Sequence, residues 1–513
     1  MSSTSAVQEV PATGLKHSEK RQWRPYLLVV MLSISLGAMS FGYASGVIGP
    51  TVAQPSFVVY FDLATRSNTT SLISAMNSLF FAGAAIFILT IPFFADKWGR
   101  KAAVGVSAAT IIIAGAVLAG SVHVAQFIVF RFVSGAGTYM MISAVTLWMT
   151  EIAPPSVRGV FVALIGASLL LGYSSSVWVG YGFLFLDSPD AWRAPFVFQG
   201  LPSLILLGLL YWLPESPRWL MIQGRYDDAR ENLLKLHTPE EVEVEFVQIR
   251  TQVEIDRTLP SSYWAMFANK NYRKRTIIGM GTFASIQTSG ILVINNYGPM
   301  IYGALGFGLE TQILYAAAWL TLGWGGGCVA LLVVDKIPRP KFIGYGLIAC
   351  QVCLIIEAAL VANFAGSDNK AALRACVAML FLFVFIYEFA LDSAQFVYLG
   401  ELFPTHIRAK GVSLGCGTLA LMNVMWLSVA PTAFEAIGWK FYLCFIIPGF
   451  LCAGLILYYF PDTLGLPLEE INAIFEVCSP CEQDKSIVGI AEEEASIPYP
   501  EKSSDAKSPD FNV

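Results

Sequence analysis

The sequence predicts an all-α membrane protein with twelve transmembrane helices arranged as two six-helix halves. Of its 513 residues, 55% are hydrophobic and only 13% are charged, whereas soluble domains carry about 25% charged residues. Twelve apolar segments each approach or exceed the roughly 20 residues that a helix needs to cross a bilayer. A long polar stretch divides these segments into two sets of six, and charged motifs recur at matching places in both sets.

The apolar segments define the expected domains. In the first half they span residues 26–47, 71–94, 102–120, 124–150, 160–184 and 195–213. In the second half they span residues 276–302, 311–334, 342–364, 371–399, 411–432 and 441–460. We expect a disordered N-terminus (1–24), a first bundle (25–213), a linker with short cytoplasmic helices (214–275), a second bundle (276–460) and a tail (461–513), mostly disordered after 481.

The distribution of Lys and Arg predicts the orientation. Short cytoplasmic loops carry an excess of these residues, and here they gather at the N-terminus, in the linker and in alternate loops between spans. Both termini are therefore expected in the cytoplasm. Asn68 begins an Asn-Thr-Thr glycosylation sequon in the first loop on the opposite side.

An internal repeat of charged residues supports two related halves. Asp and Arg follow the second span and also the eighth, while Glu and Arg, seven residues apart, follow the fourth span and also the tenth. Carboxylates and guanidiniums at helix ends can pair across helices, so we predict a latch that closes the cytoplasmic side of a transporter with two-fold pseudosymmetry. The alternative is that they are only topology signals in solvated loops. The predicted gate residues are Asp96, Arg100, Glu151, Arg158, Asp335, Arg339, Glu401 and Arg408.

Polar side chains inside the apolar segments mark the candidate site, because such residues are costly in a membrane and usually functional. Amide and carboxyl groups suit a solute whose hydroxyls both donate and accept hydrogen bonds. The alternative is that each one only satisfies a neighbouring helix. These residues are Arg131, Gln287, Asn295, Asn296, Glu357, Glu388, Asp392 and Asn423.

Several other functions are disfavoured. The pairs Cys350/Cys353 and Cys478/Cys481 have metal-like spacing but lack a second pair of ligands, so we expect no metal and no cofactor. No basic stripe indicates a nucleic-acid partner. No nucleophile–base set or phosphate-binding glycine loop indicates an enzyme.

Residues 24–475 resemble the sugar porter family of the major facilitator superfamily, and its fungal members most. The resemblance implies transport by alternating access through a central cavity between two bundles. The motifs that carry it are Phe41-Gly42-Tyr43, Asp96 to Lys101, Arg131…Gly135-Ala136-Gly137, Glu151-Ile152-Ala153-Pro154…Arg158-Gly159, Pro214-Glu215-Ser216-Pro217-Arg218, Asn295-Asn296-Tyr297-Gly298-Pro299, Glu401-Leu402-Phe403-Pro404…Arg408 and Pro461-Asp462-Thr463-Leu464-Gly465.

The same resemblance implies substrate contacts. Gln287, Glu388 and Asn423 match positions of the family's sugar-contacting pattern, and we add Asn296 and Phe396. Several family positions are altered: a glutamine of the fifth span is Gly166, the first of the paired glutamines in the seventh span is Ile286, the next asparagine is Leu292 and a tryptophan of the tenth span is Phe396. The expected cavity is therefore more apolar, which puts a plain hexose in doubt.

Coupling to protons is a separate question. Proton-coupled members of the family often carry an aspartate in the first span, paired functionally with the arginine at Arg131, but here that position is Ala44. Facilitated diffusion is the simplest inference. The competing hypothesis is that Glu388 and Asp392, four residues apart on one helix face, carry a proton, unless Asp392 pairs with Arg131 or caps a helix break.

Three functions compete. The first is a monomeric plasma-membrane carrier that imports a sugar or related polyhydroxylated solute. The second is a transporter of a non-sugar metabolite that keeps the sugar-porter scaffold. The third is a nutrient sensor, which the short tail disfavours.

Overall fold

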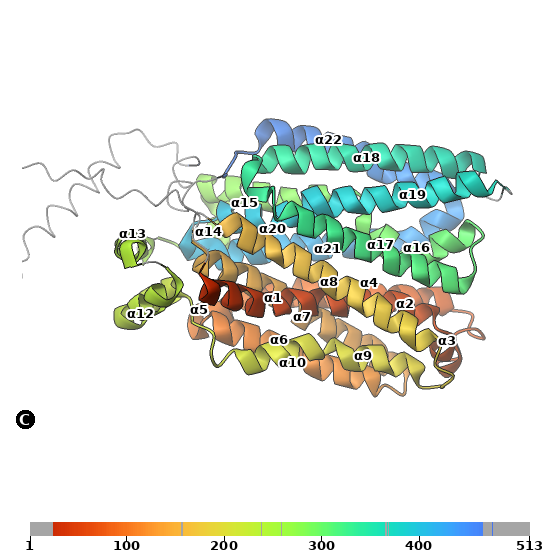
Figure 1. Ribbon diagram of the computed structural model, residues 1–513, viewed down its shortest axis with the longest axis horizontal. Coiled ribbons are helices and arrows are strands. Elements are labelled where there is room, and N and C mark those ends of the chain that lie inside the picture. The colour runs from red at the N-terminus through yellow and green to blue at the C-terminus, as the bar shows by residue number, and fades with distance from the viewer. Residues whose placement is uncertain are drawn as a thin grey trace, which may run out of the picture.

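The computed structural model describes residues 24–154, 157–237, 239–257, 259–364, 367, 369–464 and 475. The disorder expected for the N-terminal segment and for the tail after 481 lies outside these residues, except Arg24. Within the described ranges the chain forms helices and no strands. Figure 1 shows one elongated bundle of long helices, with α12 (Tyr226–Leu236) and α13 (Pro239–Arg257) beyond one end.

The first half runs from α1 to α10. Its helices are α1 (Pro25–Gly46), α2 (Ile48–Ala53), α3 (Pro55–Tyr60), α4 (Thr69–Phe87), η1 (Ile88–Thr90), α5 (Ile91–Trp98), α6 (Arg100–Ala119), α7 (Val124–Ile152), α8 (Arg158–Leu184), η2 (Ala191–Arg193), α9 (Ala194–Gln199) and α10 (Leu201–Leu209).

The second half runs from α15 to α22. Its helices are α15 (Lys270–Gln287), α16 (Ile291–Ala304), α17 (Leu309–Ala330), η3 (Val334–Lys336), α18 (Arg339–Phe364), α19 (Lys370–Tyr387), η4 (Glu388–Asp392), α20 (Ser393–Leu402), α21 (Thr405–Ile437), η5 (Gly438–Tyr442) and α22 (Leu443–Tyr459).

Between the halves, the linker folds into α11 (Pro217–Ile222), α12, α13 and α14 (Tyr263–Ala268). Helix α12 buries Ala229, Leu233 and Leu236 on one face, and the first two of these belong to a small apolar cluster shared with α11 and α13. The expected linker boundary at residue 275 falls inside α15, which begins at Lys270.

Eleven stretches of the described residues are helical, long and apolar enough to cross a membrane. The sixth predicted segment, residues 195–213, is the one that falls short as a continuous helix. It divides at Gly200 into α9 and α10, because Pro202 in the first turn of α10 has no N–H to continue the helical ladder from α9, and α10 ends at Leu209. With this broken helix, the architecture is the predicted twelve-helix one.

Two other predicted spans are interrupted next to the candidate site residues. The seventh divides into α15 and α16 at Gly290, whose φ of 78° lies in the left-handed region that favours glycine. The tenth divides into α19 and α20 around η4, which is a π-helical turn. Single π turns inside α-helices are often found at functional sites.

Glycines allow α1 and α8 to approach closely, and these helices pack along each other. A Cβ at Gly42 would lie 1.8 Å from the Leu169 carbonyl oxygen, and a Cβ at Gly172 would lie 2.1 Å from the Met39 carbonyl oxygen. The close contact depends on these residues having no side chain.

We therefore expect Gly172→Val to lose most of its folded protein, since overpacking costs about 1–3 kcal/mol and here the obstacle is backbone. The monodisperse fraction of a fluorescent fusion on size-exclusion chromatography measures the loss. Gly182→Val is the control on the same helix, because a Cβ there meets no atom within 4 Å. Equal recovery of the two variants would contradict the prediction.

Candidate functional site

A central cavity lies between the two halves. The space between its lining atoms, open solvent included, is about 520 Å³. The first half contributes residues of α1, α7 and α8, and the second half contributes residues of α15, α16, α17, α19 to α21 and η4. The lining residues are Phe41, Tyr139, Leu169, Leu170, Tyr173, Gln287, Ile291, Leu292, Asn295, Trp319, Leu320, Tyr387, Glu388, Asp392, Gln395, Phe396, Leu419 and Asn423.

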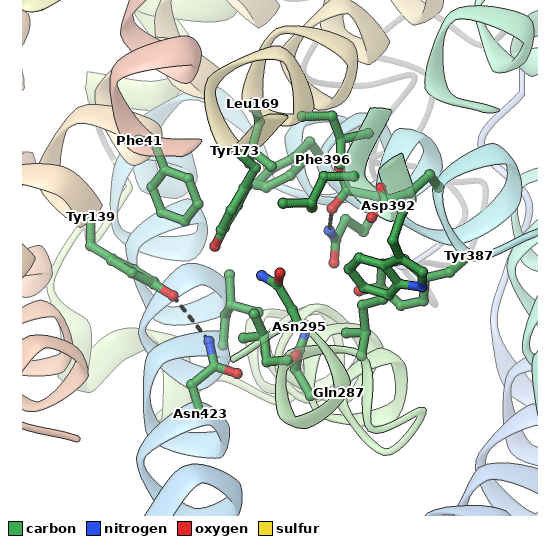
Figure 2. Close-up of a pocket in the computed structure, with 18 residues that line it drawn as sticks. Phe41, Tyr139, Leu169, Tyr173, Gln287, Asn295, Tyr387, Asp392, Phe396 and Asn423 are labelled. Atoms are coloured by element: carbon green, nitrogen blue, oxygen red, sulfur yellow. Dashed lines mark hydrogen bonds between the residues drawn. The ribbon is translucent and has the colours of Figure 1, made fainter. Parts of the chain in front are cut away.

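Amide groups reach this cavity from four helices of the second half, α15, α16, α20 and α21. Asn423 of α21 donates from Nδ2 to the hydroxyl of Tyr139 on α7, at 3.1 Å, so this hydrogen bond joins the two halves (Figure 2). The buried Oδ1 of Asn423 has no hydrogen-bond partner. Gln287 ends α15 and Asn295 lies in α16, so the break at Gly290 places both amides at the cavity.

Two carboxylates enter the cavity from the π-helical turn η4. Glu388 and Asp392 are 4% and 6% exposed, and both line the cavity. Gln395 donates from Nε2 to Asp392 Oδ1 at 2.5 Å. The second oxygens, Glu388 Oε2 and Asp392 Oδ2, have no hydrogen-bond partner. Among the residues that line the cavity, none is Lys, Arg or His.

Asp392 also faces the first half. A Cβ added at Gly166 of α8 would lie 3.0 Å from Asp392 Oδ2. The resemblance places a family glutamine at the position of Gly166. Glycine has no side chain here, and the Asp392 carboxylate lies beside the space that a side chain would fill.

Most of the predicted substrate contacts come together, and two predicted residues lie elsewhere. Gln287, Glu388, Asn423 and Phe396 line the cavity, as does Asp392, which was predicted for proton coupling, and Phe396 packs edge-on against Phe283. Asn296 does not line it. Its side chain donates to the Leu292 carbonyl at 2.9 Å, because adjacent helical residues cannot face the same side.

Arg131 is not at the cavity either, so it does not pair with Asp392. Its guanidinium is fully buried among groups of the first half: it donates to the carbonyls of Met76 (3.3 Å) and Ala44 (3.2 Å) and lies over the Phe80 ring.

Several lining residues were missed by the sequence interpretation. Asn295 was recognised as polar within a span but was not chosen over Asn296. It lies three residues after Leu292, on the same helix face, so the amide missing at Leu292 reappears one turn later. The other polar or aromatic lining residues that were not among the predicted contacts are Phe41, Tyr139, Tyr173, Trp319, Tyr387 and Gln395.

Charged motifs gather at one end of the bundle, which we call the motif end. In the first half Arg100 binds Glu151 through two hydrogen bonds of 2.7 and 2.6 Å, and Ser216 donates to Glu151 at 2.5 Å. Glu215 accepts from the N–H of Arg100 at 3.0 Å, and burial raises the pKa of Glu215 above its ordinary value.

The second half repeats this arrangement. Arg339 lies 3.0 Å from Asp335 and 3.5 Å from Glu401. Thr463 donates to Glu401 at 2.8 Å, and Asp462 accepts from the N–H of Arg339 at 3.0 Å. The predicted Arg–carboxylate pairs thus join helices within each half.

Different contacts join the two halves at the motif end. Asp335 of the second half accepts from the Val160 N–H of α8 at 3.1 Å. Asp96 of the first half lies 3.5 Å from Lys410 Nζ of α21. Arg158 and Arg408 are both buried, and Arg408 donates from Nε to the Phe403 carbonyl at 3.0 Å.

At the far end, a smaller cavity adjoins the central one and shares Asn295 and Leu320 with it. Asn296 and Gly46 line this second cavity. The exposed Asn68 immediately precedes α4. Glu357 of α18 is fully buried, and neither carboxyl oxygen has a hydrogen-bond partner.

A family model described as "Sugar (and other) transporter" matches residues 30–475. The chain belongs to this family. The "MFS-type transporter criB" of Aspergillus cristatus is 30% identical over 442 residues, which cover 85% of this chain and 90% of that protein. The "High-affinity glucose transporter" of Kluyveromyces lactis is 26% identical over a match that covers 88% of this chain and 85% of that protein. The "Quinate permease" of Neurospora terricola is 26% identical and covers 89% of each chain.

Solved structures agree on the fold. The proton:xylose symporter XylE, bound to 6-bromo-6-deoxy-D-glucose, has a TM-score of 0.79 at 22% identity and covers 88% of this chain and 99% of that one. The inward-open form of XylE from E. coli has a TM-score of 0.67 at 22% identity, covering 88% and 100%. The chain is thus an integral membrane transporter with the major facilitator fold, and its family is one of transporters rather than enzymes.

Proposed function

We propose that this transporter moves a neutral polyhydroxylated solute, a sugar or a polyol, by alternating access through the central cavity. The observation that carries the proposal is the composition of the lining: carboxyl, amide and phenol groups beside aromatic faces, and no basic side chain. These groups match hydroxyls that donate and accept hydrogen bonds. Aromatic faces such as Trp319 and Phe396 suit the apolar side of a sugar ring.

The charge of the cavity argues against an anionic solute. Some relatives are named quinate permeases, and quinate is a polyhydroxylated carboxylate. In this cavity a solute carboxylate would face Glu388 and Asp392 without a basic partner, and like charges at close range oppose binding. We therefore propose a neutral sugar or polyol, and not quinate, as the transported solute.

The contacts at the motif end suit a latch. Asp335 at the Val160 amide and Asp96 beside Lys410 hold the two halves together there, while the Arg100 and Arg339 pairs hold the helix ends within each half. We infer that the halves rock apart at these inter-half contacts and expose the cavity to the motif side.

Uptake measurements test the proposal directly. Cells that lack endogenous carriers are given labelled D-glucose, D-xylose, D-sorbitol, quinate and choline, with and without the transporter. We expect saturable uptake of at least one of the three neutral solutes and none of choline. Uptake of the neutral solutes equal to the empty-vector control, in cells that carry the protein at their surface, would reject it.

Two adjacent asparagines offer a matched pair of variants. We expect Asn295→Leu to raise the KM of the transported solute about fivefold to tenfold, because one hydrogen bond to a neutral partner contributes about 1 kcal/mol. Asn296→Leu should change KM by less than about twofold, since Asn296 bonds its own helix. Initial uptake rates over a concentration series give both values, and a larger effect at Asn296 would contradict the assignment.

A second candidate function rests on the apolar part of the lining. Eight aliphatic or phenyl side chains face the cavity, namely Phe41, Leu169, Leu170, Ile291, Leu292, Leu320, Phe396 and Leu419. They suit a more apolar non-sugar metabolite. Inhibition of labelled-solute uptake by aryl glycosides, compared with inhibition by the corresponding free sugars, separates the two candidates. Stronger inhibition by the aryl compounds would favour the second candidate.

For the cell, we propose a monomer in the plasma membrane with both termini and the motif end in the cytoplasm. Lys and Arg gather at the motif end, as expected of cytoplasmic loops. Asn68 would then be extracellular and available for glycosylation. Glycosidase digestion that sharpens the wild-type band but leaves Asn68→Gln unchanged would support this; an identical band for both proteins would contradict glycosylation.

A further inference from the structure

We propose that Glu388 and Asp392 together hold a proton that crosses the membrane with the solute, which makes the protein a proton symporter. This inference rests on the proposed function, because it takes the central cavity as the transport site. The sequence favoured facilitated diffusion, because Ala44 stands where proton-coupled members of the family often carry an aspartate. The proton site proposed here lies on the tenth span instead of the first.

The geometry of the pair is the first support. The π-helical turn η4 places both carboxyl groups at the same cavity, where each is at least nine-tenths buried. Each has one oxygen without a hydrogen-bond partner. The one side chain that the structure shows donating to the pair is the neutral amide of Gln395.

The surroundings of the pair are the second support. Tyr173 of α8 and Tyr387 of α19 lie close to both carboxyl groups, and Cys350 of α18 lies close to Glu388. Helix α17 presents Gly323 to Glu388, and α15 contributes Gln287 to the same cavity. The buried cation Arg131 interacts with Tyr173, and its guanidinium donates hydrogen bonds to the backbone carbonyls of Met76 and Ala44.

Electrostatics then requires a proton. Two unpaired carboxylates in a low-dielectric cavity would repel each other and lose their hydration, and such groups take up a proton instead of remaining charged. The shared proton is taken from the aqueous phase to which the cavity is open and converts one carboxylate to a carboxyl. Its release to the opposite phase restores the carboxylate, so the cycle consumes no other reactant.

The position of Asp392 links this proton to the movement of the halves. Asp392 belongs to the second half, but its free oxygen lies against Gly166 of the first half. When the halves rock, Asp392 loses this dry contact and becomes hydrated, which favours the charged form. Proton binding and the direction in which the cavity opens are thereby coupled.

A substrate-free measurement tests proton binding. The infrared C=O stretch of protonated carboxyl groups is recorded on purified protein in lipid nanodiscs at neutral pH. The variant Glu357→Gln serves as the background, because Glu357 is another buried carboxyl without a partner that lies outside the cavity. In this background we expect a remaining band, and we expect Asp392→Asn or Glu388→Gln to remove or shift it. A spectrum unchanged by both substitutions would overturn the inference.

Transport measurements test coupling. In proteoliposomes, an inwardly directed proton gradient should accumulate the neutral solute found by the uptake panel at least about fivefold, which corresponds to roughly 1 kcal/mol. Asp392→Asn should abolish accumulation, and the solute exchange that remains at equal concentrations should not depend on the proton gradient. Glu357→Gln should still accumulate solute. A chain that fails to fold would lose exchange as well, so the two defects are distinguishable.

The outcomes separate the two proposals. Gradient-independent uptake of a neutral solute would overturn symport and leave the proposed function intact. Uptake of choline instead of the neutral solutes would overturn both, because the carboxylates would then bind a cationic solute. A carboxyl band that depends on Asp392, without uptake of any neutral solute, would reject the proposed substrate and support proton binding.

Discussion

A Gly159→Val variant is expected to reach the membrane and to transport at less than about one-hundredth of the wild-type rate, a change that corresponds to roughly 2.7 kcal/mol. A Cβ at Gly159 would lie 1.6 Å from Asp335 Oδ1 and 2.7 Å from Arg339 Nη2. The Asp335 side chain would therefore have to move and would lose its hydrogen bond to the Val160 amide. The halves could then no longer close at the motif end.

Two comparisons separate this effect from misfolding. Gly182→Val, on the same helix but in open space, should transport normally. Asp335→Ala added to Gly159→Val removes the obstructing carboxylate, so it should restore part of the transport. Surface biotinylation normalises the rates to the amount of protein. Wild-type transport by Gly159→Val would show that closure at this contact is not needed.

Glu151→Ala is expected to have the largest effect on stability. Glu151 is the bidentate partner of Arg100, and both are almost fully buried. Removing one member of a buried ion pair costs about 3–5 kcal/mol, because the other charge stays buried without compensation. We expect a lower Tm of the purified protein and a smaller folded fraction.

A second carboxylate on the same arginine provides the control for Glu151→Ala. Asp96 lies 3.9 Å from Arg100, and its side chain is 46% exposed. Exposed pairs of this kind contribute about 0–1 kcal/mol, so Asp96→Ala should lower Tm much less. Fluorescence-monitored thermal unfolding in one detergent compares the two variants. An equal or larger decrease for Asp96→Ala would contradict the argument.

The fold could be predicted from the sequence because a membrane restricts the choices. Apolar stretches of sufficient length must become helices, and the paired charged motifs revealed two halves. The breaks were not predicted. Gly200, Gly290 and the π turn at Glu388–Asp392 lie inside segments that were each predicted as one span, and overall hydrophobicity carries no signal for a local interruption of the hydrogen-bond ladder.

The candidate site was only partly predictable. Gln287, Glu388 and Asn423 were found because their positions match a family pattern, and they do line one cavity. Asn295 lines this cavity and Asn296 does not, because adjacent helical residues point in different directions, and the helix phase after Gly290 could not be read from the sequence. The neighbours of Arg131 were also hidden, since its acceptors are backbone carbonyls.

The contact between Tyr139 and Asn423 sets an entry condition for any occupant. An arriving molecule meets an Asn423 N–H that already donates to the Tyr139 hydroxyl at 3.1 Å, so a group that displaces one of these partners leaves the other without this hydrogen bond. A compound that forms hydrogen bonds with the phenol and the amide together replaces the bond that both lose. A smaller compound, or one with a single polar group, leaves one of the two without a hydrogen-bond partner. Selectivity among solutes would then depend on the Tyr139–Asn423 hydrogen bond of the empty protein as well as on the fit of each solute to the cavity.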